Sequence, residues 1–175
     1  MLKVIGTIVV IVVAGVLVAA AVQPDHFQVK RSATIDAPPD RIYALISDFH
    51  RWRSWSPYEK LDPGMRRTYS GAEHGVGSVY EWAGNSKAGQ GRMEITRAPR
   101  ASEVAIRLDF VKPIAAHNVA TFTFEPRGEA TTVTWAMDGP TPYVGKIIHL
   151  FVDMDRLVGR DFETGLANLK TIAER

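Results

Sequence analysis

Cysteine is absent from this 175-residue chain, which excludes a disulfide framework and a thiolate metal site. The five histidines are scattered and none lies in an H-E-x-x-H string, so we expect no metal site. The glycines between residues 71 and 91 lack the context of a phosphate-binding loop, and no serine occupies a G-x-S-x-G elbow. The sequence therefore predicts no metal and no cofactor.

A strong charge of either sign is also lacking. The chain has 21 Lys and Arg against 19 Asp and Glu. Lys3 is the only charged residue within 1–22, so the remainder has 20 basic and 19 acidic side chains, a net charge of +1. This balance does not favour a nucleic-acid partner, and we expect none.

What the chain does contain is a long apolar run near its beginning. Val4–Val22 comprises 19 residues without a charge, about 28 Å as a helix, which matches the hydrocarbon core of a bilayer. The run is longer than the roughly 7–15 apolar residues of a secretory signal. We therefore expect residues 1–23 to be a single-pass anchor in the cell membrane, with residues 4–22 in contact with lipid.

A cleaved secretory signal is the alternative interpretation of this run. Lys3 would then be its charged start, and Ala19–Ala21 would be its cleavage site. Under the anchor interpretation, Lys3 favours an amino terminus on the cytoplasmic side. The soluble domain is then expected on the non-cytoplasmic side.

The rest of the chain is expected to be a linker, residues 24–26, and one domain, residues 27–175. Alternating apolar residues predict a strand over 27–35, and two short helices follow over 40–47 and 48–55. Six further alternating segments are joined by short turns, which predicts antiparallel strands over residues 66–70, 77–83, 89–97, 102–111, 115–125 and 131–137.

The last segment has helical periodicity. Pro142 suits the first turn after a Thr141 N-cap, and apolar residues then recur every three or four positions as far as Leu169. This long helix must bury its apolar stripe against the sheet, which predicts an α+β domain. Three glycines interrupt the helix, and we expect them to permit a bend or a close approach to the sheet: Gly145, Gly159 and Gly165.

Four segments carry a resemblance to a known family: IDAPPDRIYALISDFHRWRSWSPYE at 35–59, GVGSVYEW at 75–82, GQGRMEITRAPRASEVAIRLDF at 89–110 and MDRLVGRDFETGLANLK at 154–170. With them, residues 27–175 resemble the polyketide cyclase/dehydrase-like branch of the START-related (SRPBCC) superfamily. The resemblance implies a helix-grip fold, in which a curved antiparallel sheet wraps around the C-terminal helix and leaves an apolar cavity. Some relatives cyclise or dehydrate polyketides, and others carry lipids or quinones.

We therefore expect a cavity lined by the inward-facing apolar side chains. Aromatic and methionine side chains suit an elongated or ring-shaped apolar ligand. The competing interpretation is that they only fill a core. The residues predicted to bind the ligand are Trp55, Tyr80, Trp82, Met93, Leu108, Phe110, Phe122, Trp135, Met137, Phe151 and Met154.

Trp52 and Trp55, flanked by Arg51 and Arg53, form the most distinctive local cluster. Three interpretations stay open. The cluster braces the short helices against the sheet, gates the mouth of the cavity, or lies at a membrane interface, where Trp and Arg are common.

Ionisable side chains give weaker signals, and no catalytic residue is assigned. His149 and Asp153, four residues apart, form either a pair for general-base chemistry or a solvated surface pair. Four charged residues lie on predicted strands, and any that faced inward would need a partner: Arg31, Glu81, Arg92 and Glu94.

Two functions of different classes follow. The first is membrane-tethered binding or transport of a hydrophobic small molecule or lipid, which is not transformed. The second is a cyclase- or dehydrase-like enzyme, which needs at least two polar or ionisable side chains converging in the cavity. The sequence leaves open whether the chain is an enzyme.

Overall fold

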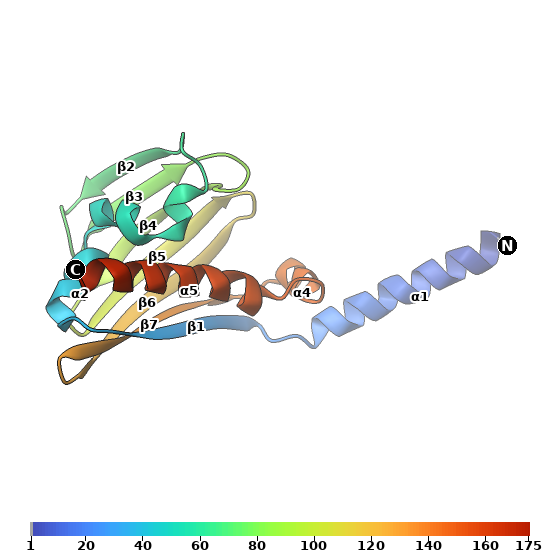
Figure 1. Cartoon of the computed structure of the whole chain (residues 1–175). Helices are drawn as coiled ribbons and strands as arrows, with labels where there is room; N and C mark the ends of the chain where they lie inside the picture. The colour runs from blue at the N-terminus through green and yellow to red at the C-terminus, as the bar shows by residue number, and fades with distance from the viewer. Residues whose placement is uncertain (1) are drawn as a thin grey trace.

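The computed structural model describes residues 2–175, and its elements follow the predicted order (Figure 1). The first half of the chain contains α1 (Leu2–Ala21), β1 (His26–Ile35), α2 (Pro39–Ile46), the 3-10 turn η1 (Phe49–Arg51), α3 (Trp52–Trp55), the 3-10 turn η2 (Pro57–Lys60), β2 (Arg66–Gly71) and β3 (Ser78–Ala83). The second half contains β4 (Gln90–Arg97), β5 (Glu103–Lys112), β6 (Ala116–Arg127), β7 (Ala130–Pro140), α4 (Tyr143–His149) and α5 (Met154–Ala173).

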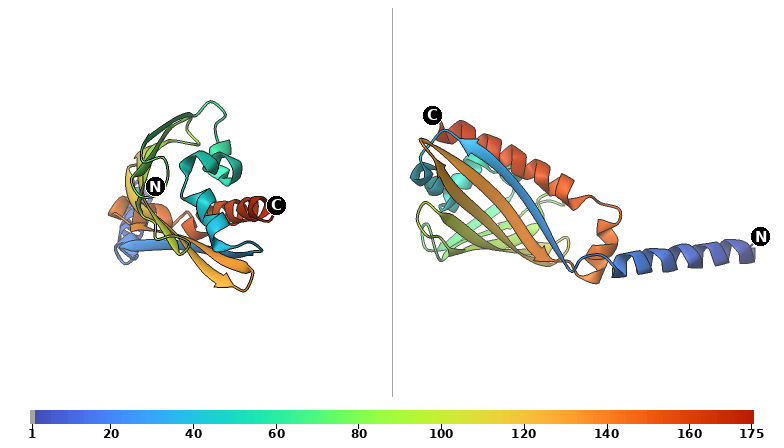
Figure 2. Two further views of the ribbon diagram at one scale, coloured as in Figure 1. Left: turned by 90° about the vertical axis from the view of Figure 1, so that its left-hand side faces the viewer. Right: turned by 90° about the horizontal axis from the view of Figure 1, so that it is seen from below.

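The seven strands form one antiparallel sheet in the order β1-β7-β6-β5-β4-β3-β2. Strands β2 to β6 each pair with the next strand in the chain, whereas β1 pairs with β7 along ten register positions, from His26↔Pro140 to Ile35↔Thr131. Figure 2 shows the sheet curving around α5. The predicted α+β helix-grip fold is therefore confirmed.

Alternating burial explains why the sheet packs on α5. Strands β6 and β7 bury every second side chain over most of their length, as the period of a half-buried strand requires. The facing side of α5 buries Phe162, Leu166 and Leu169. Burial of side chains of this size contributes about 1.5–3 kcal/mol each relative to exposure.

The expectation of one continuous helix from Pro142 to Leu169 is wrong. Helix α4 ends at His149 and α5 begins at Met154. Asp153 has an extended backbone, and its carboxylate accepts a hydrogen bond of 2.9 Å from the Arg156 N–H, so it caps a new helix. Thr141 does not cap α4, because the N-cap position is Pro142 and it makes no side-chain bond to the helix.

Helix α1 extends away from the domain (Figures 1 and 2). Its segment Lys3–Ala21 is long and apolar enough to cross a membrane, and almost none of it is buried against the domain. The expected anchor, residues 1–23, also includes Met1, which lies outside the described residues. A membrane anchor and a secretory signal both have a helix of this kind.

Candidate ligand cavity

A cavity of about 210 Å³ lies between the inner face of the sheet, η2 and α5. Strands β3 to β7 supply its floor, and the first two turns of α5 close one side. It is lined by Trp52, Ser56, Tyr58, Glu59, Leu61, Met65, Tyr80, Trp82, Ala88, Met93, Leu108, Phe110, Ala120, Trp135, Met137, Leu157, Val158, Asp161 and Phe162.

The structure brings most of the predicted site residues together at this cavity. Those that line it are Tyr80, Trp82, Met93, Leu108, Phe110, Trp135 and Met137. Trp55 and Phe122 are fully buried behind the lining. Phe151 and Met154 lie elsewhere, beside the break between α4 and α5. They were expected in the cavity because the helix was predicted to be continuous.

Stacked aromatic rings give the cavity a rigid wall. The ring of Trp135 is nearly parallel to that of Phe162, with ring centroids 4.0 Å apart. Trp135 also stacks on Phe122, with ring centroids 4.8 Å apart. Trp55 meets both Phe122 and Trp135 edge-on. Such pairs hold their geometry better than aliphatic contacts do. The wall is therefore preformed.

The tryptophan cluster braces the short helices. The Trp52 and Trp55 indole N–H groups donate to the carbonyl oxygens of Ile46 and Leu45, at 2.9 and 3.1 Å. Both side chains are buried, which excludes a position at a membrane interface. Trp52 also lines the cavity.

A glycine makes room for one lining ring. Gly91 is the direct partner of Trp82 across the β3–β4 pair. A Cβ atom at Gly91 would lie 2.3 Å from the edge of the Trp82 indole and 2.6 Å from the Asp109 carbonyl oxygen. Any larger residue there would have to displace the indole, so Gly91 shapes the cavity.

Glu59 places a carboxylate in this apolar wall. Its oxygens accept hydrogen bonds from the Tyr80 hydroxyl and from Arg67 Nε, each at 2.6 Å. Burial, followed by the bond to Glu59, raises the pKa of Tyr80 above its usual value of 10.0. The bond to Glu59 also raises the pKa of Arg67. The three groups thus form a buried, paired network with a charged acid at the cavity wall.

Asp161 is the second carboxylate of the cavity, and within residues 2–175 it forms no ion pair. Burial alone raises its pKa above the usual 3.8. Tyr58 lies near it, and the pKa of Tyr58 is raised by its own burial and then by the negative charge of Asp161. A carboxylate whose pKa is raised is a stronger base than an exposed one, which suits it to accept a proton.

One buried donor at the cavity is also unsatisfied. Within residues 2–175, the indole N–H of Trp135 has no hydrogen-bond partner. Leaving such a group unpaired costs about 1–3 kcal/mol. A ligand oxygen that reached it would remove that cost.

Neither carboxylate at the cavity was predicted from the sequence, although the sequence around Asp161 contains a signal for it. Asp161 falls between Val158 and Phe162 on the stripe of α5, where a polar residue breaks the apolar pattern. Glu59 lies in the short η2 turn, where no periodicity predicts an inward direction.

The other ionisable candidates do not reach the cavity. Arg31 does face α5, where it pairs with Asp155 and Glu163 at 2.9 and 2.8 Å. The remaining three lie on the other side of the sheet: Glu81 is exposed, and Arg92 and Glu94 pair with each other.

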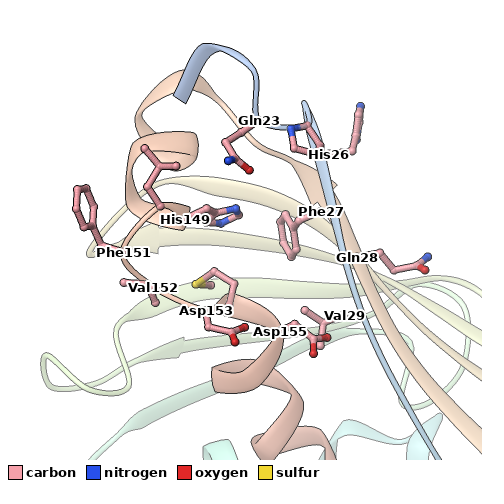
Figure 3. A pocket seen from close by; sticks show the side chains of 13 residues that line it. Gln23, His26, Phe27, Gln28, Val29, His149, Phe151, Val152, Asp153 and Asp155 are labelled. Atoms are coloured by element: carbon pink, nitrogen blue, oxygen red, sulfur yellow. The ribbon is translucent and has the colours of Figure 1, made fainter. Parts of the chain in front are cut away.

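A second, open pocket of about 530 Å³ lies between the start of β1 and the break between α4 and α5 (Figure 3). His149 packs edge-on against Phe27 there, with ring centroids 5.9 Å apart. Asp153 is occupied as the cap of α5. His149 and Asp153 thus have separate roles, which does not favour a general-base pair over the alternative of two separate surface residues.

The sequence profile of a known family, described as "Polyketide cyclase / dehydrase and lipid transport", matches residues 26–174. The chain therefore belongs to this family. A search among curated proteins found no match.

Solved structures share the fold at low identity. Major latex-like protein 151 from Panax ginseng aligns with a TM-score of 0.62 at 14% identity, covering 87% of this chain and 100% of that one. The Aha1 protein from Colwellia psychrerythraea gives 0.60 at 15%, covering 85% and 96%. The di-domain ARO/CYC protein StfQ of the steffimycin biosynthetic pathway gives 0.64 at 10%, covering 85% and 51%.

Proposed function

We propose that this chain is a single-pass membrane protein that binds a hydrophobic small molecule or lipid in the cavity between the sheet and α5. The observation that carries the proposal is the wall itself. Aromatic, methionine and leucine side chains dominate it, and only Ser56, Glu59 and Asp161 among the lining residues have side chains that are neither aromatic nor apolar. This is the composition of a small-molecule pocket. The family description, which includes lipid transport, supports the same class of ligand.

The proposal assigns α1 as an uncleaved anchor with the domain on the non-cytoplasmic side. The length of the span and the position of Lys3 support this assignment. Detection of the full-length mass in a membrane fraction would support the anchor. A chain that lacks residues 1–21 would identify a cleaved signal.

Native mass spectrometry of the full chain in nanodiscs tests the binding. We expect a bound apolar molecule, detected as additional mass that is lost on denaturation. The variant Ala120→Leu adds bulk on the inner face, where Ala120 lines the cavity, and should remove that mass without unfolding the domain. The matched control Ala136→Leu adds the same bulk on the outer face of β7 and should retain it.

The outcomes separate a ligand site from a loosely packed core. If no apolar mass is found in the wild type, even after incubation with membrane lipid extract, the cavity is not a ligand site. If Ala120→Leu and Ala136→Leu retain the same bound mass, the ligand lies outside the cavity.

A second candidate function is a cyclase or dehydrase reaction on a ligand in the same cavity. It is favoured by one observation: Glu59 and Asp161 both line the cavity, with two tyrosines between sheet and helix. Asp161 would act as the proton acceptor, since burial raises its pKa and it forms no ion pair in the described part of the chain. Asp161→Asn should then trap a precursor that is heavier than the wild-type ligand by one water molecule. An identical bound mass in both proteins would count against dehydration.

A further inference from the structure

Exposed apolar side chains of the domain gather at one end. Within residues 23–175, ten large hydrophobic side chains are exposed, and eight of them lie where α1 joins the domain. Val119, on the outer face of β6, and Val76, at the opposite end of the sheet, are the other two. The eight form what we call the tether-end patch: Leu61, Val111, Ile114, Tyr143, Val144, Phe151, Val152 and Leu157.

The strand register places these segments at one end. His26, where β1 starts, pairs with Pro140, where β7 ends, and Gln90 at the start of β4 pairs with Lys112 at the end of β5. The β5–β6 turn therefore lies at the same end of the sheet as the linker and α4. Figure 1 shows α4 and the start of α5 on the side from which α1 leaves.

Direct bonds hold α1 against this end. The Tyr143 hydroxyl of α4 donates to the Leu17 carbonyl oxygen of α1 at 2.8 Å, and Ala20 of α1 is fully buried. Lys146 pairs with Asp25 of the linker at 2.5 Å. Tyr143 is thus held one turn inside the apolar span. Tyrosine is common at that depth, where the bilayer meets water.

The linker is too short to lift the domain away. Four residues separate Ala21 from His26, which reach at most about 13–14 Å when extended. Two acidic groups at this end are paired with cations within the protein, Asp25 with Lys146 and Asp155 with Arg31. These two carboxylates therefore add little charge repulsion against an anionic bilayer.

The cavity opens at the same end. Of its lining residues, Leu61 and Leu157 are exposed, at 40% and 57%. Both belong to the tether-end patch. Ala88, in the β3–β4 turn, also lines the cavity.

We propose that the tether-end patch docks on the bilayer that α1 crosses, so that the cavity mouth faces the lipid and the ligand enters from the membrane. The occupant of the patch is a lipid surface. This inference rests on the proposed function, because it needs α1 to be a membrane anchor. It adds an orientation and a route: the ligand partitions into lipid first and reaches the cavity without crossing water.

Depth-dependent fluorescence quenching tests the orientation. The chain has no native cysteine, so Phe151→Cys and Ile114→Cys each take one environment-sensitive NBD label. The full chain is reconstituted in phosphatidylcholine–phosphatidylglycerol vesicles with nitroxide-labelled lipids. We expect quenching at both positions to be several-fold stronger than at Val76→Cys, a similarly exposed position at the far end, at 58%. Equal, weak quenching at all three would overturn the docking.

A transfer assay tests the route, with diphenylhexatriene as the probe. The double variant Phe151→Asp with Ile114→Asp should slow transfer of the probe from vesicles to the cavity several-fold, while binding at equilibrium is unchanged. An unchanged transfer rate would overturn the inference and leave the proposed binding intact. If the wild-type chain binds no probe, or is extracted from vesicles by alkaline carbonate, both the proposed function and this inference fail.

Discussion

Among single residues, Glu59 and Arg67 form the most consequential pair, because their charges are buried together. Their side chains are only 5% and 13% exposed. Removing one partner of a buried pair leaves the other charge uncompensated, which typically costs about 3–5 kcal/mol. The pair thus holds η2 against the edge of the sheet at the cavity wall.

We expect Arg67→Met to lower the free energy of unfolding by about 3 kcal/mol, because the Glu59 carboxylate stays buried without a cation. Adding Glu59→Gln should recover most of that loss, since the amide still accepts from Tyr80. Urea unfolding of the full chain in detergent measures both. The neighbouring Arg66→Met, on the exposed face, is the control, and an equal loss there would contradict the prediction.

The pKa of Asp161 predicts a pH dependence with a definite sign. Burial raises this pKa above 3.8, so the folded state keeps the proton longer than the unfolded state does. Stability contributed by Asp161 therefore falls as the pH rises from 3.8 through the raised folded value.

Asp161→Asn cannot titrate, so we expect the variant to melt at a higher temperature than the wild type near pH 7. The difference in melting temperature should vanish at about pH 3, below the pKa of Asp161 in the unfolded state. Thermal melts across this range measure the effect. Glu129→Gln, in the exposed β6–β7 turn, is the control. A constant difference at every pH would mean that Asp161 acts by packing rather than by charge.

The alternation of apolar residues along the strands predicted the apolar wall of the cavity, but not the two carboxylates Glu59 and Asp161. Tyr80, Met93, Leu108 and Trp135 follow strand parity, which is why the sequence placed them inward. Glu59 belongs to a single turn, whose direction depends on the tertiary contacts of Arg67 and Tyr80. No local pattern records such contacts.

Among the elements, α5 and β1 cross at a glycine. A Cβ atom at Gly159 would lie 2.0 Å from Nη2 of Arg31, whose guanidinium bonds Asp155 and Glu163 on either side of it. The sequence predicted close approach or a bend at the glycines of this helix. The structure confirms close approach at Gly159.

We expect Gly159→Ala to lower the melting temperature by about 2–4 °C, because the Arg31 guanidinium must move. In an Arg31→Ala background the same change should raise stability, since alanine favours a helix. Thermal melts of the four proteins form a double-mutant cycle. Gly145→Ala in α4, where a Cβ meets only ordinary contacts, is the control. A loss that persists without Arg31 would refute this account.

The division between α4 and α5 shows where element prediction fails. Apolar spacing runs through Ile147, Ile148 and Phe151 without interruption. The helix restarts where the Arg156 N–H donates to the Asp153 carboxylate, and Asp is common at helix starts and on helix surfaces alike. Phe151 and Met154 were therefore assigned to the wrong environment.

For the whole molecule, the strand order predicts a gradient of local stability. Strands β6 and β7 are flanked on both sides, whereas β2 pairs only with β3 and is exposed along one edge. We expect backbone amides of β6 and β7 to exchange slowest with deuterium, and those of β2 and α4 much faster. Hydrogen-exchange mass spectrometry of the full chain measures this. Uniform protection across the sheet would contradict it.

The join between α1 and the domain has a mechanical consequence. Strand β1 follows α1 after a linker of four residues, and it is bonded to β7 along its whole length. A pull on α1 therefore acts along the axis of β1, so the load is shared by all the β1–β7 hydrogen bonds at once. Opening the pairs one after another would need a force across the strand. With α1 as the proposed membrane anchor, movement of the bilayer should thus displace the domain as one body before it extracts its first strand.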